Sequence, residues 1–280
     1  MWKRYRILLI VILLSVLILG SIAFVCVNHF IGFARAVGDS AFAYDVREIW
    51  VEHDGIRLYG KALIPQGEAP FPTVIYAHGA ESDYKADMAT LKSLAMSGAA
   101  CYTFDFYGWT DRSTGPEGTS WFKDSKQRDY EAQVLKQTED LNAVIDSIRA
   151  LEFTDSERLY LLGSSMGGAT VATAAVSHSE DIRGIILQYP AINLNPMAMV
   201  EGSERNVNGY TGPVLILQGT EDKIVPLSMS EQLEEYYNTL YENHANMIVY
   251  EGQPHVFTGK IKVEAAREIF QFLKETDGMR

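Results

Sequence analysis

Cysteine is scarce in this chain, which contains two cysteines among 280 residues. Cys26 lies in a long apolar run near the amino end, and Cys101 lies in a short apolar run with strand-like composition. A disulfide between them is therefore not expected. No spacing of Cys and His that is typical of a zinc site occurs. An exported domain of this length needs no disulfides, because it can bury a substantial core.

Basic residues are also few, with 24 Lys and Arg against 36 Asp and Glu and a formal net charge of −12. The three cations Lys3, Arg4 and Arg6 precede any acid, so the rest of the chain is more acidic still. Such a body would repel phosphates, which argues against nucleic acid or anionic lipid as a partner of the body. Internal repeats and low-complexity tracts are absent as well.

The amino end contains a long run without charge, from Ile7 to Val27. As a helix this run would span about 30 Å, the hydrocarbon thickness of a bilayer. A cleaved signal peptide is the alternative, but its apolar region is usually about 7–15 residues long. Ala34-Arg-Ala36 resembles a cleavage site, although it lies well beyond the run. We therefore predict an uncleaved single-pass anchor, with secretion after cleavage as the alternative. The preceding cations favour a cytoplasmic amino end and an extracytoplasmic body.

The sequence predicts three regions: a stub and transmembrane anchor over 1–30, a linker over 31–45, and a catalytic domain over 46–280. A hairpin is expected at Asp54-Gly55, between strand-like residues 46–53 and 56–64. Strands and helices then alternate. The predicted strands are 73–77, 99–104, 158–162, 184–189, 213–217 and 247–251; the predicted helices are 86–96, 129–151, 166–177, 228–241 and 263–274. This order indicates an α/β fold, with a mostly parallel sheet, an amino-terminal antiparallel hairpin and helices on both faces.

Ligands of such sheets bind beyond the carboxyl ends of the strands, so polar residues directly after strands are the candidates for a site. Gly163-Ser-Ser-Met-Gly167 fits the pattern G-x-S-x-G in one frame only, with Ser165 at its centre. In this motif a sharp turn from strand to helix presents the serine, and the glycines permit close backbone approach. A structural glycine-rich turn is the competing interpretation.

A serine nucleophile needs a base, usually a histidine that a carboxylate orients. Of the six histidines, His255 follows the last predicted strand on the correct side of the sheet. Asp222 follows the strand 213–217 and is the preferred acid, with Glu221 as the alternative. A loop histidine and an Asx-type turn are the simpler interpretations of these two positions. Asp222 and His255 come after Ser165 in the chain, and each follows a successive strand. This order favours the catalytic interpretation.

A fourth polar turn, Ala77-His-Gly-Ala80, follows the strand 73–77. Acyl transfer places negative charge on the carbonyl oxygen, and backbone N–H groups aimed at that oxygen lower the barrier. The predicted donors are the backbone N–H groups of Ala80 and Met166.

With these four positions in order, the chain resembles the α/β-hydrolase superfamily over about residues 46 to 275. It is most similar to the serine-aminopeptidase-like and cinnamoyl or feruloyl-esterase-like branch. The similarity rests on YAHGA, FDFYGWTDRS, LLGSSMGG, LQGTEDKIVP and EGQPHVF. The resemblance implies Ser165 as nucleophile, His255 as base, Asp222 as its orienter, and Ala80 and Met166 as oxyanion donors.

The chain departs from the family at three places. Ser164 stands where the family often has histidine, and Thr110 replaces a glycine of the D-F-x-G-x-G-x-S pattern. The cap between strands, about 190–212, is shorter than in related esterases. Because of these departures, the sequence does not identify the acyl group or the alcohol of the substrate.

The sequence therefore predicts a membrane-anchored serine hydrolase of carboxylic esters that forms an acyl-enzyme and needs no metal or organic cofactor. A peptidase or amidase of the same fold is the alternative, for which Glu81, Asp83 or Glu117 would hold the substrate's ammonium group. An acyltransferase and a non-catalytic tethered binding protein are further alternatives. The sequence does not indicate an oligomeric state.

Overall fold

One sheet of eight strands organises the part of the chain that this computed structural model describes, residues 44–116, 130–192, 207, 209–241 and 244–277. The strand order is β1-β2-β4-β3-β5-β6-β7-β8. β1 pairs with β2, and β2 with β4, in antiparallel fashion, whereas all other neighbours are parallel. The strands are β1 (Tyr44–His53), β2 (Ile56–Pro65), β3 (Phe71–Ala77), β4 (Ala100–Phe104), β5 (Thr154–Ser164), β6 (Ile182–Gln188), β7 (Val214–Gly219) and β8 (Ala245–Tyr250).

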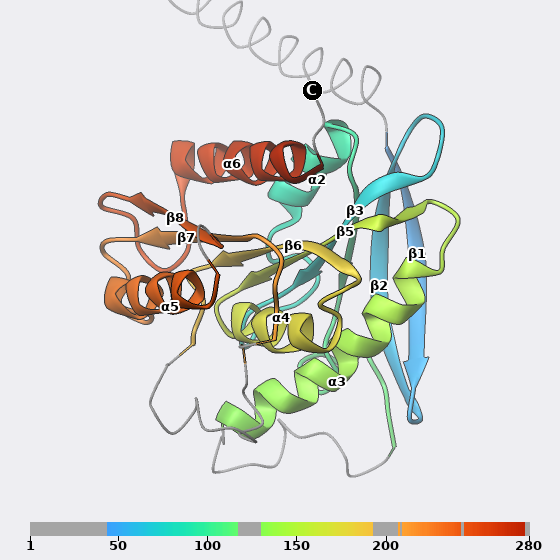
Figure 1. Cartoon of the computed structure of the whole chain (residues 1–280). Coiled ribbons are helices and arrows are strands. Elements are labelled where there is room, and N and C mark those ends of the chain that lie inside the picture. The colour runs from blue at the N-terminus through green and yellow to red at the C-terminus, as the bar shows by residue number, and fades with distance from the viewer. Residues whose placement is uncertain (1–43, 117–129, 193–206, 208, 242–243, 278–280) are drawn as a thin grey trace, which may run out of the picture. The chain divides into compact units, whose positions relative to one another are not determined.

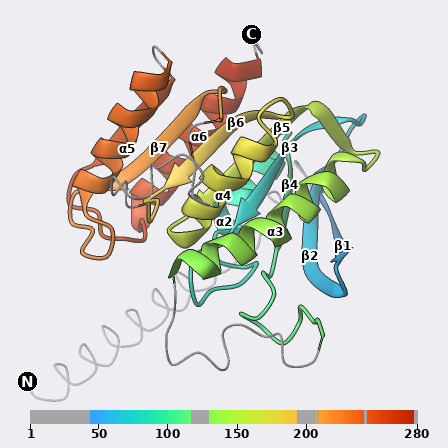
Figure 2. The same ribbon diagram turned by 60° about the horizontal axis from the view of Figure 1, so that its bottom comes forward.

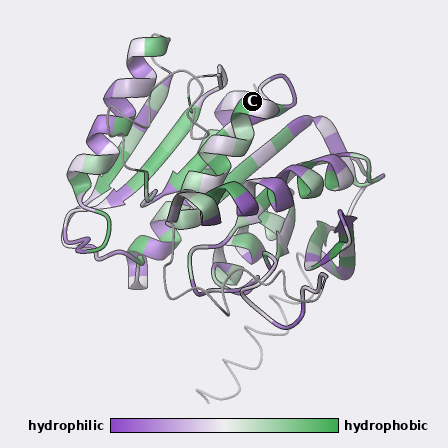
Figure 3. Cartoon of the chain, turned by 90° about the horizontal axis from the view of Figure 1, so that it is seen from below, coloured by the Kyte–Doolittle hydropathy of each residue, from purple (hydrophilic) through white to green (hydrophobic). Residues whose placement is uncertain are grey.

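Helices cover both faces of this sheet (Figures 1 and 2). α2 and α6 lie on one face, and α3, α4 and α5 lie on the other. The described helices are α2 (Met88–Met96), α3 (Tyr130–Arg149), α4 (Met166–Ser177), α5 (Leu227–Leu240) and α6 (Gly259–Asp277). The central strands are mostly hydrophobic, while the helices alternate between hydrophobic and hydrophilic residues (Figure 3). Helices that bury one face and expose the other enclose a sheet that is apolar on both sides.

The hairpin at the start of the sheet follows from its two turn residues. Asp54 has φ 46° and Gly55 has φ 77°, and His53 is paired with Ile56 across the turn. Two residues with positive φ make the turn whose twist matches antiparallel strands, and Gly adopts this backbone without strain. The first hairpin is therefore determined locally.

The predicted fold class is confirmed for the described body, including the antiparallel hairpin and the helices on both faces. Each predicted strand and helix is present, with boundaries that differ by a few residues. β5 begins at Thr154 rather than at 158, and α6 begins at Gly259 rather than at 263. Both extensions are mostly polar, and hydrophobic periodicity does not detect such ends.

The predicted membrane anchor Ile7 to Val27 lies outside the described residues, as does most of the linker. Within the described ranges, no helix is both long and apolar enough to cross a membrane. The predicted cap 190–212 also lies largely outside them, since only 190–192, 207 and 209–212 are described.

Candidate active site

Ser165 occupies the sharp turn between β5 and α4. Its backbone has φ 55° and ψ −119°, a sparsely populated conformation that costs on the order of 1–3 kcal/mol for a residue with a side chain. The surrounding backbone holds it in place. Its N–H donates to the Gln188 carbonyl at 3.0 Å, and its carbonyl accepts from Ala191 N–H at 3.0 Å. The serine is thus fixed beyond the carboxyl end of β5.

The two glycines of the motif are required by close backbone contacts. A Cβ on Gly163 would lie 2.3 Å from the Gly167 carbonyl oxygen, and one on Gly167 would lie 2.2 Å from the Ala77 carbonyl oxygen. The contacted atoms belong to the backbone, so a side chain at either glycine would require a strand or a helix to move. These contacts explain why the glycine pattern frames Ser165 rather than Ser164.

The structure brings together the three side chains that the sequence singled out. His255 Nε2 lies 3.0 Å from Ser165 Oγ, and His255 Nδ1 lies 2.7 Å from Asp222 Oδ2. Because a carboxylate only accepts, Nδ1 carries the proton that it donates to Asp222. Nε2 is then the acceptor for the Ser165 hydroxyl. This arrangement allows the imidazole to remove the serine proton.

Asp222 is held by more than His255. Its side chain is fully buried, and its Oδ1 accepts the N–H groups of Ile224 and Val225, each at 2.9 Å. Its Oδ2 also accepts Gln218 Nε2 at 3.1 Å. Such donors stabilise the ionised carboxylate in a buried position. It is Asp222 that contacts the histidine, and the alternative acid Glu221 is exposed.

His255 is also oriented by an aromatic neighbour. The ring of Tyr189 lies 4.8 Å from the His255 ring and 5.2 Å from the ring of Phe257. Tyr189 follows β6 with φ 39°. Together with the bond to Asp222, this packing restricts the rotamers that the imidazole can adopt.

The two predicted oxyanion donors lie on the loop after β3 and at the start of α4. Among the described residues, neither the Ala80 nor the Met166 backbone N–H donates to another protein atom. Met166 is the first residue of α4, where backbone N–H groups lack helical partners. A Cβ on Gly79, next to Ala80, would lie 3.2 Å from Ser165 Cβ. The loop therefore passes directly beside the serine.

His78, on the same loop, has a structural role that the sequence did not indicate. It is fully buried, and burial lowers its pKa. Its Nδ1 lies 2.7 Å from the Gly79 carbonyl oxygen, and its Nε2 accepts Phe106 N–H at 3.3 Å. Neutral His78 thus ties the loop after β3 to the loop after β4.

The loop after β4 is organised around Asp105, which is fully buried. Its Oδ2 accepts Arg112 Nε at 2.6 Å and Thr110 Oγ1 at 2.8 Å, and Arg112 also donates to Asp83 at 2.8 Å. Thr110, where the family pattern has glycine, therefore supplies a hydrogen bond to this loop. The sequence showed the motif but not the ion pairs within it.

A second, partly buried His–Asp pair ties the first hairpin to α3. His53 Nε2 lies 2.9 Å from Asp140 Oδ1, and Asp140 Oδ2 accepts Tyr107 N–H at 2.8 Å. The bond to Asp140 raises the pKa of His53 despite its partial burial. Burial in turn raises the pKa of Asp140. From the sequence alone, His53 could be recognised only as a hairpin residue.

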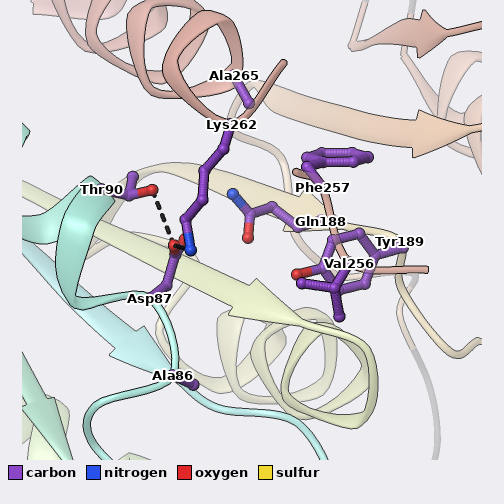
Figure 4. Close-up of a pocket in the computed structure, with 9 residues that line it drawn as sticks. All are labelled: Ala86, Asp87, Thr90, Gln188, Tyr189, Val256, Phe257, Lys262 and Ala265. Atoms are coloured by element: carbon purple, nitrogen blue, oxygen red, sulfur yellow. Dashed lines mark hydrogen bonds and ion pairs between the residues drawn. The ribbon is translucent and has the colours of Figure 1, made fainter. Parts of the chain in front are cut away.

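A small cavity of about 20 Å³ lies between α2 and α6, next to Val256 and Phe257, which follow His255 in the chain (Figure 4). It has room for about one ordered water. Asp87 and Lys262 form an ion pair at its edge, with Nζ 3.1 Å from Oδ1. Tyr189 and Val256 also line it, and the ring of Tyr189 packs against that of His255. Across the described ranges, no three or more His, Cys, Asp or Glu side chains gather as metal ligands would.

Comparisons with known proteins found a matching family model, related sequences and similar folds. Residues 68–203 match the family model described as "Serine aminopeptidase, S33". The uncharacterized protein YfhR of Salmonella typhimurium is 28% identical over 207 residues, which are 64% of this chain and 65% of that protein. The chain thus spans just under two thirds of the length of such relatives.

Two solved esterases have a similar fold. Est1E from Butyrivibrio proteoclasticus, bound to ferulic acid, has a TM-score of 0.64 and 22% identity, and the match covers 80% of this chain and 98% of that one. Acetyl xylan esterase 1 from a Thermoanaerobacterium species has a TM-score of 0.62 and 17% identity, covering 83% and 84%. At these identities the likeness shows the fold. The fold is that of the α/β-hydrolases, and over residues 68–203 the chain is similar to serine hydrolases.

Proposed function

We propose that this chain is a membrane-anchored hydrolase of carboxylic esters that acts through an acyl-enzyme on Ser165. The observation that carries the proposal is the continuous hydrogen-bonded series Ser165–His255–Asp222, placed on a strained strand-to-helix turn. A serine hydroxyl bound to a histidine that is itself bound to a buried carboxylate is an activated nucleophile.

The reaction proceeds in two halves. Ser165 Oγ attacks the ester carbonyl while His255 Nε2 takes its proton, and the N–H groups of Ala80 and Met166 bind the oxyanion. The histidine then protonates the leaving alcohol, and the acyl group remains on the serine. Water, deprotonated by His255, attacks this acyl-enzyme, and His255 returns the proton to Ser165 Oγ as the acid leaves. Asp222 stabilises the imidazolium in both halves.

The ion pair of Asp83 with Arg112 favours an ester over a peptide with a free amino end. Of the carboxylates considered as ammonium anchors, Asp83 is bound by Arg112 at 2.8 Å. Glu117 lies outside the described residues, and Glu81 is exposed. The solved structures of similar fold include an esterase bound to ferulic acid and an acetyl xylan esterase, which supports an ester substrate. The family description as a serine aminopeptidase keeps the peptidase as the alternative.

The test compares p-nitrophenyl butyrate with an aminoacyl p-nitroanilide, using the full chain in mild detergent. We expect hydrolysis of the ester to exceed that of the anilide, and Ser165→Ala to abolish it. The matched control is Ser156→Ala, which changes an exposed serine at the opposite end of the same strand and should leave activity unchanged. Full esterase activity in Ser165→Ala would refute the proposal, and a preference for the anilide would favour the peptidase.

The anchor is a separate part of the proposal and rests on the uncharged run Ile7 to Val27 behind three cations. We expect the full chain to stay with membranes after carbonate extraction. Protease added to intact protoplasts should remove the body. Removal only after lysis would contradict the orientation, and a mature protein that begins after Ala36 would favour a cleaved signal peptide.

A further inference from the structure

Gln218 is a buried polar side chain behind the proposed acid. It is the penultimate residue of β7 and is fully buried. A strand in the interior of an apolar sheet gains nothing from an amide unless its donors and acceptor are satisfied. The position of this side chain therefore needs a reason beyond packing.

Both of its polar atoms have partners, Nε2 in the turn that carries the acid and Oε1 in α5. Nε2 donates to Asp222 Oδ2 and to the Val225 carbonyl, each at 3.1 Å, and approaches the Gly219 carbonyl at 3.3 Å. Oε1 accepts from Ser230 Oγ of α5 at 2.8 Å. Because a carboxylate and a carbonyl only accept, the atom that faces them must be the NH₂ group. These acceptors fix the orientation of the amide, and Ser230 then donates its hydroxyl proton to Oε1.

We infer that Gln218 is a positioning residue for the catalytic acid, an inference that rests on the proposed function. Asp222 Oδ2 is the oxygen that also accepts His255 Nδ1 at 2.7 Å. The amide and the imidazole therefore share one oxygen, and the amide restrains the rotation of the carboxylate about its bond to Cβ. Ser230, through Gln218, extends this series into α5.

The same contact sets how much negative charge faces the imidazole. Asp222 receives four N–H donors, from Ile224, Val225, Gln218 and His255. Without the Gln218 donor, more charge remains on the oxygen that faces His255, which favours the protonated, inactive imidazole. Loss of the amide should therefore weaken the base at low pH as well as misalign it.

The experiment measures the pH profile of kcat/KM for p-nitrophenyl butyrate with the full chain. Gln218→Met keeps the length of the side chain and removes the donor. We expect a fall in kcat of roughly tenfold, the factor of about one net hydrogen bond. The acidic limb should move to higher pH by about half a pH unit. Ser230→Ala should move it in the same direction by less.

The matched control is Gln137→Met, which changes another buried glutamine, on α3, whose Oε1 accepts from Thr170 at 2.9 Å. Gln137→Met also replaces a buried glutamine by methionine, and it should leave the pH profile unchanged. A Gln218→Met profile that coincides with that of Gln137→Met overturns the inference. This outcome differs from failure of the proposed function, in which Ser165→Ala would retain wild-type activity.

Discussion

Replacement of Lys262 by Met tests whether the ion pair at the edge of the cavity joins α2 to α6 (Figure 4). Lys262 Nζ lies 3.1 Å from Asp87 Oδ1, and the same oxygen accepts Thr90 Oγ1 at 2.9 Å. The Asp87 side chain is 8% exposed and the Lys262 side chain 33%. Lys262→Met keeps the aliphatic stem and leaves the carboxylate buried without its cation.

The expected loss in the free energy of unfolding follows from how exposed the two side chains are. Breaking a fully buried pair by removing one partner costs about 3–5 kcal/mol, whereas an exposed pair contributes about 0–1 kcal/mol. Since the lysine is one third exposed, we expect a loss of about 1–2 kcal/mol in the free energy of unfolding. Asp87→Asn keeps an acceptor for Thr90 and removes the charge. The double variant should therefore be more stable than Lys262→Met alone.

Urea unfolding followed by circular dichroism measures the three variants and gives the coupling free energy of the pair. The cycle isolates the charge interaction, because Asn and Met keep most of the volume of the side chains that they replace. A Lys262→Met variant within 0.5 kcal/mol of wild type, with no recovery in the double variant, would refute the reasoning.

Three further predictions concern other contacts. Gly167→Ala should lower the free energy of unfolding by about 3 kcal/mol, because its Cβ would lie 2.2 Å from the Ala77 carbonyl oxygen; unchanged urea unfolding would contradict this. Asp140 raises the pKa of His53 above 6.5, so the pair stabilises the fold fully below about pH 6.5 and less as the pH rises through the raised pKa. His53→Gln should therefore lower the thermal midpoint more at pH 6 than at pH 8, and an equal drop at both would count against the pair. Asp222→Asn should lower kcat for the ester by about 10⁴-fold, and a loss below tenfold in steady-state assays would remove Asp222 from its role.

Much of the fold could be predicted because its signals are local. Asp54-Gly55 determines a two-residue turn by itself, and the buried run Leu159 to Leu162 needs only its own composition to indicate a central strand. The glycines around Ser165 likewise act through backbone contacts within one turn. The order Ser165, Asp222, His255 could then be placed at one edge of the sheet, because parallel strands end there together.

The supporting contacts could not be predicted, because they join residues far apart in the chain. Asp87 meets Lys262 only after α2 and α6 dock on the same face, and His53 meets Asp140 only after α3 packs beside the hairpin. Gln218 is only four residues from Asp222, yet in the sequence it is one polar residue at the end of an apolar strand. Its role becomes visible through the turn that folds back over it.

The most direct test of the central claim is the site at which a fluorophosphonate probe reacts, located by mass spectrometry of peptides from the full chain. We predict a covalent adduct on Ser165, absent in Ser165→Ala and retained in Ser164→Ala, whose hydroxyl is bound to Gln188 Oε1 at 2.8 Å. An adduct on Ser164, or labelling that persists in Ser165→Ala, would contradict the assignment of Ser165 as the nucleophile.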